Sequence, residues 1–225
     1  MQIQSDPKYQ EAMAFYLSGE WTEAEKAFLE LRKSYPDSAF AHLILGNIYY
    51  SLGKLDTSVE EYQKAVEIHP EFGIALYKLG VCQYRMGKLT EALESFQQVI
   101  DSGSESHAMA AYFVGLIHFF LGNDESAAVA FERFRELSPE SMIANYYLAQ
   151  LRIKRKEYDS ARKLLKELAA ETPNFAEVHY MMGVASFGLH DTTGAMTSLR
   201  KALEINPDDE RARSKLTLIS DVQWP

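Results

Sequence analysis

The chain lacks the residues from which disulfide frameworks and most metal sites are built. It has a single cysteine, Cys82, so neither an intrachain disulfide nor a multi-cysteine metal site is available. None of its six histidines lies three or four residues from another, so no helix face offers a paired metal site. The glycines occur singly, without the spacing of a phosphate-binding or dinucleotide-binding loop. We therefore expect no metal and no cofactor. Cys82 is expected to be buried as a small hydrophobic side chain.

Long apolar runs and a secretory pattern are also lacking. The longest apolar stretch, Ala110 to Leu121, is too short to span a bilayer and is interrupted by Gly115 and His118. The first residues have neither a basic start nor an apolar segment, so we expect no signal peptide in this stretch. The sequence thus predicts no direct membrane insertion and a cytoplasmic location.

Positive charge is scarce in the first part of the chain. The net charge is -9, with 47% hydrophobic and 24% charged residues, a composition that suits a folded core. Between Ser5 and Ser141, 11 Lys and Arg stand against 21 Asp and Glu, whereas the remainder is nearly balanced. Such a surface repels nucleic acid and anionic membranes, so neither is expected as a ligand.

What the sequence does contain is an internal repeat, which the prolines mark. Five of them, Pro36, Pro70, Pro139, Pro173 and Pro207, are separated by 34, 69, 34 and 34 residues. The interval of 69 is two repeats plus one residue, and the irregular boundary falls at Asp101 to His107, where Ser104 takes the place of proline. A period in this range indicates a stacked array of helical units.

Aligning repeat starts at Ser5, Ala39, Gly73, Ala108, Met142 and Ala176 brings three further columns into register. The eighth position is always small: Ala12, Gly46, Gly80, Gly115, Ala149 and Gly183. The twentieth is small as well: Ala24, Ser58, Ala92, Ala127, Ala161 and Ala195. The twenty-fourth is large and apolar: Phe28, Tyr62, Phe96, Phe131, Leu165 and Leu199. Small residues let two helices cross closely, and large ones fill the space beside the crossing.

These columns resemble the tetratricopeptide repeat family, whose unit is a 34-residue helix-turn-helix. The resemblance covers residues 5 to about 209 and implies an all-α, right-handed α-solenoid forming a single domain over residues 1–225. The fourth position departs from the family, which often has Trp there, and reads Lys8, His42, Leu76, Ala111, Asn145 and His179. Packing within some repeats is expected to differ accordingly.

Local signals support two helices per repeat. The first helices are expected to end near Gly19, Gly53, Gly87 and Gly122, where glycine can adopt the left-handed conformation of a C-cap. Lys156 and His190 replace glycine in the last two repeats, at a cost of about 1 kcal/mol if that conformation is kept. The second helices are expected to begin after the capping residues Thr22, Asp56, Thr90, Asp124, Asp159 and Thr193, with Thr22 and Glu25 as a capping box. Solvated positions are expected for Glu60, Glu61, Glu91 and Glu94.

A further amphipathic helix is predicted at about 208–222. Its apolar stripe comprises Ala212, Leu216, Ile219 and Val222, and it is placed to cover the last repeat. Six helix pairs and this capping helix make thirteen helices.

The resemblance also implies a concave groove lined by the second, fifth, ninth and twelfth positions of each first helix. These positions are rich in aromatic residues, five of the six fifth positions being tyrosine. The peptide-binding groove residues are thus expected to be Tyr9, Tyr16, Phe40, Asn47, Tyr50, Tyr77, Tyr84, Tyr112, Phe119, Tyr146, Tyr180 and Phe187. An alternative is that these rings only pack one first helix against the next. Aromatic rings with hydroxyls are typical of peptide hot spots, so we favour the groove.

Charged groove contacts are sparse. The carboxylate clamp of some family members is not reproduced, because only Asn47 stands at a clamp position. Basic residues gather at Arg152, Lys154, Arg155 and Lys156, and they form either a solvated face or a site where Lys154 meets an acidic group of a partner. The predicted function is a non-catalytic scaffold or adaptor that binds a polypeptide segment. Two alternatives remain: a chaperone for secretion or envelope-assembly clients, supported by Met13, Met109 and Met181 near the groove, and a scaffold that self-assembles into a homo-oligomer.

Overall fold

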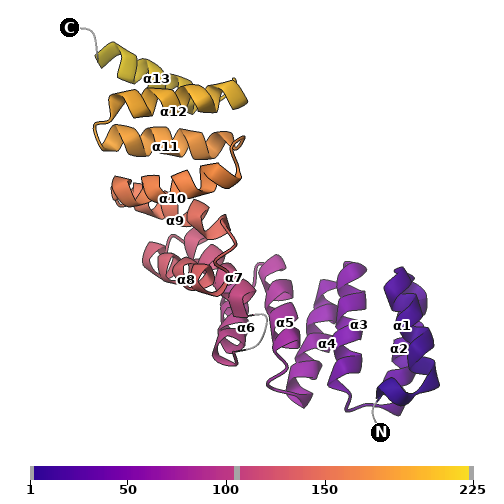
Figure 1. Cartoon of the computed structure of the whole chain (residues 1–225). Helices are drawn as coiled ribbons and strands as arrows, with labels where there is room; N and C mark the ends of the chain where they lie inside the picture. The colour runs from indigo at the N-terminus through magenta and orange to yellow at the C-terminus, as the bar shows by residue number, and fades with distance from the viewer. Residues whose placement is uncertain (1–2, 104–106, 223–225) are drawn as a thin grey trace. The chain divides into compact units, whose positions relative to one another are not determined.

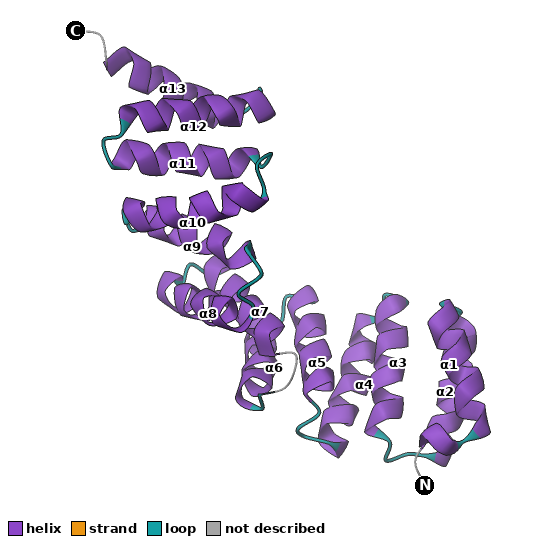
Figure 2. Ribbon diagram, viewed as in Figure 1, coloured by secondary structure: helices purple, strands orange, loops and turns teal. Residues whose placement is uncertain are grey.

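The computed structural model describes residues 3–103 and 107–222, with side chains to residue 221. Within these ranges the chain forms thirteen α-helices, a short 3-10 helix at Ile3–Ser5 and no strand (Figures 1 and 2). The helices are α1 Pro7–Ser18, α2 Trp21–Ser34, α3 Ala39–Ser51, α4 Leu55–Ile68, α5 Gly73–Arg85, α6 Leu89–Asp101, α7 His107–Phe120, α8 Asp124–Leu137, α9 Ile143–Lys154, α10 Tyr158–Glu171, α11 Ala176–Gly188, α12 Thr192–Ile205 and α13 Glu210–Val222. The predicted all-α architecture of helix pairs is confirmed.

The chain divides into two compact units, Met1–Ile117 and His118–Pro225. In the first unit the five consecutive pairs from α1–α2 to α5–α6 pack together, and in the second unit the same holds for the pairs from α8–α9 to α12–α13. Each unit is therefore a stack of antiparallel helix pairs, as in a solenoid. A single domain spanning residues 1–225 stays a prediction.

The crossing within each helix pair depends on the small eighth position. A Cβ atom added to Gly46 would lie 2.5 Å from the ring of Tyr62, and one added to Gly80 would lie 2.8 Å from Cε1 of Phe96. Tyr62 and Phe96, both from the twenty-fourth column, are fully buried. The close contact of these two columns, expected from the sequence, thus forms the core of each pair.

Cys82 belongs to the same core. It is fully buried in a cluster with Leu43, Tyr62, Ala65 and Leu79, and burial raises the pKa of its thiol. A buried neutral thiol behaves as a small apolar side chain, as the sequence predicts.

The predicted C-cap column is confirmed by the backbone. Gly53, Gly87 and Gly122 have φ of 73°, 73° and 75°, and the two non-glycine members, Lys156 and His190, have φ of 61° and 60°. The left-handed conformation is therefore imposed by the turn and is kept even where a side chain opposes it.

The predicted starts of the second helices are wrong by one or two residues. Thr22 and its counterparts lie within the first helical turn, and the residues before the helices are Glu20, Lys54, Lys88, Asn123, Glu157 and Asp191. Among these six, only the side chain of Asp191 accepts a hydrogen bond from the helix, from the backbone N–H of Gly194. The capping box of Thr22 and Glu25 is likewise not formed, because the helix has already begun at Trp21.

The capping helix α13 covers the last repeat as predicted. Ala212 and Ile219 are buried, and they pack with Ala195, Leu199 and Leu216 in one cluster. The side chain of Val222 lies outside the described residues. At the irregular boundary α6 ends at Asp101 and Gly103 has a φ of 64°, while Ser104 also lies outside the described residues.

Candidate functional site

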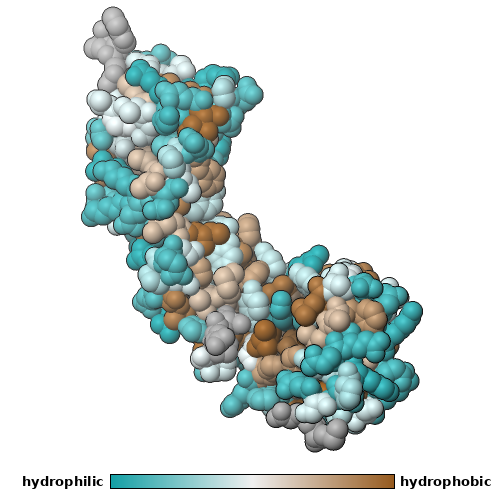
Figure 3. Space-filling model, turned by 45° about the vertical axis from the view of Figure 1, so that its right-hand side comes forward, coloured by the Kyte–Doolittle hydropathy of each residue, from teal (hydrophilic) through white to brown (hydrophobic). Residues whose placement is uncertain are grey.

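The residues predicted to line the groove lie on α1, α3, α5, α7, α9 and α11, the first helices of their repeats. Eleven of the twelve are half-buried, and Phe187 is 37% exposed. The only aliphatic residue at the fifth position, Leu43, is instead 5% exposed. The predicted groove residues are therefore neither fully buried nor free of contacts. On the face that Figure 3 displays, patches of hydrophobic residues lie exposed among hydrophilic ones.

In the first unit, Tyr77 lies at the edge of an aromatic cluster. Its ring centroid is 6.0 Å from that of Phe96 and 6.2 Å from that of Phe113. Tyr84 contacts Phe113 edge-on at 5.3 Å. Burial is the main cause that raises the pKa of the Tyr77 hydroxyl, and the nearby Tyr50 raises it further. One side of each tyrosine ring thus packs against the phenylalanines. The prediction of an open groove did not include these packing contacts.

Asn47 links three helices through its amide. Its Nδ2 donates to the hydroxyl of Tyr16 at 3.1 Å, and its Oδ1 accepts from the hydroxyl of Tyr62 at 2.8 Å. Because the oxygen of Tyr16 accepts from Asn47, the hydroxyl proton of Tyr16 is left to donate elsewhere. This arrangement presents a hydrogen-bond donor on the predicted groove face.

A cation lies against another of these rings. The guanidinium of Arg85 is 4.7 Å from the centroid of Tyr50. At the N-terminal end, Tyr9 contacts Phe40 at 6.1 Å and Phe28 at 6.4 Å. Cation–π and edge contacts of this kind fix the ring orientations before any ligand binds.

In the second unit, aromatic contacts again run between successive repeats. Phe119 packs edge-on against Tyr147 at 5.3 Å, and Tyr147 stacks on Phe131 at 4.8 Å. Tyr146 stacks on Phe175 at 5.6 Å, and burial is the largest of the effects that raise its pKa.

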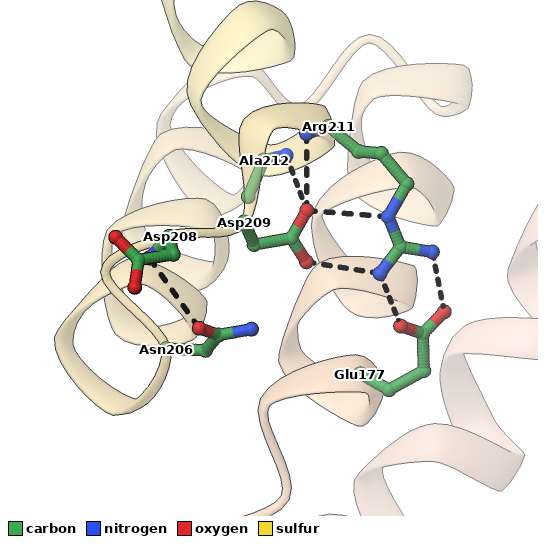
Figure 4. Close-up of polar contacts among 6 residues, drawn as sticks. All are labelled: Glu177, Asn206, Asp208, Asp209, Arg211 and Ala212. Atoms are coloured by element: carbon green, nitrogen blue, oxygen red, sulfur yellow. Dashed lines mark hydrogen bonds and ion pairs between the residues drawn. The ribbon is translucent and has the colours of Figure 1, made fainter.

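At the C-terminal end, Arg211 of the capping helix reaches the carboxylate of Glu177 on α11 (Figure 4). Arg211 of α13 donates to Glu177 at 2.6 and 3.3 Å and to Asp209 at 2.9 and 3.2 Å. Its guanidinium lies 4.6 Å from the ring centroid of Tyr180, and these carboxylates raise the pKa of Arg211. Lys215 lies in the same way over Phe187, at 5.6 Å.

Lys154 already has an acidic partner within the chain. Its Nζ lies 2.6 Å from Oδ2 of Asp124, and its side chain is 63% exposed. Both residues line a pocket of about 270 Å³ together with Phe119 and Gln150. The contact between Lys154 and a partner stays a prediction, and it now requires exchange of Asp124 for a partner's carboxylate.

Two expectations about individual residues near this site are wrong. Glu61 is not solvated but 4% exposed, and its carboxylate accepts a hydrogen bond from His42 at 2.6 Å and pairs with Arg32 at 2.7 Å. Met181 is 4% exposed and packs inside the core, whereas Met109 is 42% exposed. Neither burial can be read from helical periodicity alone.

Sequence reasoning missed Phe113 and Tyr147, which occupy the sixth position of their repeats. Phe113 stacks on Phe96 at 5.0 Å as Tyr147 stacks on Phe131. The signal was available, because each stands one residue after a tyrosine of the fifth column, in Tyr112–Phe113 and Tyr146–Tyr147.

Among the described residues, two further kinds of feature are absent. These residues contain no group of three or more His, Cys, Asp or Glu side chains arranged to hold a metal ion. They also contain no helix with the length and apolar character needed to cross a membrane.

Comparison with known proteins gives a consistent result. Models of the tetratricopeptide repeat match residues 8–38, 74–102, 122–184 and 176–209, and a TPR repeat model matches residues 46–87. No curated protein is matched by the sequence.

Solved structures share the fold at low sequence identity. YrrB, a TPR protein with an unusual peptide-binding site, is similar with a TM-score of 0.76 and 22% identity over 85% of this chain and 98% of YrrB. PilF of Pseudomonas aeruginosa gives a TM-score of 0.73 and 18% identity, with 93% and 95% of the two chains covered. MamA gives a TM-score of 0.67 and 21% identity, with 83% and 96% covered. The chain therefore belongs to the tetratricopeptide repeat family, whose members generally mediate protein–protein interactions.

Proposed function

We propose that the protein is a non-catalytic scaffold or adaptor that binds a polypeptide segment along the aromatic face of its first helices. The observation that carries this proposal is the half-buried state of the predicted groove rings on α1, α3, α5 and α7 in the first unit and of Phe119, Tyr146 and Tyr180 in the second. Rings fixed on one side and open on the other provide contact area at a low cost in side-chain entropy.

The polar groups on this face favour a peptide ligand over a purely apolar one. Tyr16 has a hydroxyl proton to donate, since its oxygen accepts from Asn47. The backbone carbonyls of a peptide are suitable acceptors for it. A ligand would thus place apolar side chains against Tyr77 and Tyr84 and a carbonyl near Tyr16.

Two other kinds of partner remain within this proposal. A client chaperone would use the same face promiscuously, and the exposed Met109 is the one methionine of the expected three that favours this. A homo-oligomer would use the face to bind a second copy of the chain. The cytoplasmic location and the lack of nucleic-acid binding stay predictions.

Selection from a phage-displayed library of linear peptides tests the proposal. Peptides that bind the full chain should lose about thirtyfold in affinity when Tyr50 or Tyr84 is replaced by Ser, as for a hot-spot aromatic. Tyr35→Ser is the matched control, because Tyr35 lies in the turn between α2 and α3 and hydrogen-bonds to Asp6. Equal effects of all three substitutions, or the selection of no peptide, would contradict the proposal. Light scattering over a concentration series tests self-association.

A further inference from the structure

A crevice lies between the second helices α4 and α6, and its lining includes none of the predicted groove residues. The crevice has a volume of about 490 Å³ and a floor formed by Leu76 and Leu79 of α5. Val66 of α4 extends this apolar floor. Because the lining comes from three helices of the first unit, the crevice is a fixed feature of two neighbouring repeats. We name it the α4–α6 crevice.

Its rim carries three carboxylates and no ion pair. Glu67 stands on α4, and Glu91 and Glu94 stand on α6. All three are exposed, and none forms an ion pair with any residue that the structure describes. An apolar floor below an uncompensated negative rim matches a side chain with an aliphatic stem and a cationic head.

A buried amide adds a polar contact within the crevice. Gln83 is 9% exposed, and its Oε1 accepts from the hydroxyl of Ser95 at 2.7 Å. Its Nε2 has no hydrogen-bond partner among the described residues. The serine hydroxyl can also accept, so rotation of the amide by 180° keeps the bond to Ser95 and turns Oε1 toward the crevice. Gln83 is thereby able to accept a hydrogen bond from a cationic group.

The preceding pair of second helices, α2 and α4, is joined by an internal cation. Nη1 of Arg32 on α2 lies 2.7 Å from Oε1 of Glu61 on α4. One repeat later, Val66 stands at the position of Arg32 and Ser95 at the position of Glu61. The α4–α6 crevice therefore lacks the internal cation that the preceding pair has, while its rim stays acidic.

We infer that the α4–α6 crevice binds a lysine or arginine side chain from a basic segment of a partner protein. The stem of that side chain lies on Leu76, Leu79 and Val66, and its head group meets Glu67, Glu91, Glu94 and the amide of Gln83. This surface is separate from the aromatic face, so it can hold the same partner at a second point or a different one.

The probe for this inference is the peptide acetyl-Gly-Arg-Gly-amide. Its binding is measured from the NMR chemical shifts of the backbone amides of the full chain. Its saturable shifts should map to the backbone amides of Val66, Leu79, Gln83 and Ser95. The same peptide with citrulline, which keeps the shape and loses the charge, should bind at least about tenfold more weakly. A rise in salt from about 50 to 300 mM should weaken the arginine peptide.

Three sets of variants separate a specific site from general attraction to an acidic protein. Replacing Glu67, Glu91 and Glu94 together by Gln should weaken binding by about tenfold. Replacing the exposed Glu11, Glu23 and Glu60 by Gln removes the same charge outside the crevice and should change binding by less than about twofold. Val66→Arg places a cation at the position of Arg32 and should block the peptide.

The inference is overturned if both triple variants lose binding equally, if the citrulline peptide binds as well, or if the shifts map to the aromatic face. Thermal melts confirm that each variant is folded. If the crevice does not bind the arginine peptide, the proposal that the aromatic face binds a polypeptide is not affected, because none of the substituted residues lies on that face.

Discussion

The imidazole of His42 lies 2.6 Å from the carboxylate of Glu61, measured from Nδ1 to Oε2, in the interior of the second repeat. Arg32 meets the other oxygen of the same carboxylate at 2.7 Å, and Nε2 of His42 lies 3.3 Å from the carbonyl of Pro36. This carboxylate thereby joins α2, α3 and α4. The fourth position of the repeat, where the family often has a bulky apolar residue, is here the centre of a buried ionic cluster.

The first prediction concerns acid stability. Burial by itself opposes ionisation of Glu61, but the hydrogen bond with His42 and the charges of Arg32, His42 and Lys64 outweigh it, so the pKa of Glu61 is lowered. A carboxyl whose pKa is lower in the folded chain stabilises the fold above its unfolded pKa of about 4.3, and that stability is lost as the pH falls through the folded value. Glu61→Gln should lower the free energy of unfolding at pH 7 by about 2 to 4 kcal/mol.

The variant should also flatten the fall in stability below about pH 5. Urea unfolding at a series of pH values measures both effects. The matched control is Glu60→Gln, because Glu60 is the exposed neighbour on the same helix. If both variants kept the wild-type pH dependence, Glu61 would have no special role.

The second prediction concerns the helix crossing in the third repeat. A Cβ atom at position 80 would lie 2.8 Å from Cε1 of Phe96, so Gly80→Ala requires the Phe96 ring or one of the two helices to shift. Overpacking costs about 1 to 3 kcal/mol, and the better helix propensity of alanine returns about 1 kcal/mol. We expect a net loss of about 1 to 2 kcal/mol in thermal or urea unfolding. Ser51→Ala, at an exposed position of α3, should stay within about 0.5 kcal/mol.

The third prediction uses the two left-handed residues that are not glycine. Lys156 and His190 have φ of 61° and 60°, a conformation that costs a side-chain-bearing residue about 1 kcal/mol. Lys156→Gly and His190→Gly should each raise the free energy of unfolding by a few tenths to about 1 kcal/mol, since the flexible unfolded glycine offsets part of the gain. The reverse change, Gly53→Ala, should destabilise the chain, although an added Cβ there meets no atom within 4 Å. If Lys156→Gly and His190→Gly both destabilised the chain, the side chains of Lys156 and His190 would have contacts that outweigh the backbone strain.

The sequence predicts those features that one repeat carries within itself. The C-cap column could be read from Gly19, Gly53, Gly87 and Gly122, and the same register places Lys156 and His190 in that column. That these two residues keep the left-handed conformation is shown only by the structure. The start of each second helix was misplaced because serine, threonine and aspartate also occur within a first turn. At the observed positions, the backbone of Glu20 and Lys54 has ψ of 68°, and no capping hydrogen bond from a side chain forms there.

Features that depend on neighbouring repeats were harder to predict. Glu61 is buried because Arg32, 29 residues earlier, reaches it, and no periodicity within one repeat reveals that contact. Tyr77 was correctly placed on a first helix, yet its burial depends on Phe113 of the next repeat. The columns thus predict which residues face a neighbour, whereas the three-dimensional stacking decides how far each is covered.

The fourth prediction concerns the attachment of the capping helix. Arg211→Gln removes the two-point contact with Glu177 and the guanidinium above Tyr180. Because Arg211 is 56% exposed, we expect a loss of only about 1 kcal/mol in overall stability. Hydrogen exchange in α13 should become faster, while exchange in α9 should not change. Arg200→Gln is the control, and the same acceleration in that variant would argue against a specific role for Arg211.

The last prediction separates the two roles of the groove tyrosines. Tyr77 is half-buried against Phe96 and Phe113, so Tyr77→Ser should cost about 1 to 3 kcal/mol, between the values for surface and core aromatics. Tyr77→Phe keeps those contacts and should change stability by less than about 0.5 kcal/mol. Phe113→Ala removes a ring that is also half-buried and should cost about 1 to 3 kcal/mol.

Peptide binding then decides the function of Tyr77. At a temperature where every variant stays folded, a peptide selected on the wild type should lose about tenfold or more in affinity for Tyr77→Ser. A smaller loss for Tyr77→Phe would measure the contribution of the hydroxyl. If instead Tyr77→Ser bound the peptide as the wild type does and differed only in its melting temperature, Tyr77 would serve the core alone. The binding face would then be limited to rings with less internal contact, such as Phe187, which is 37% exposed.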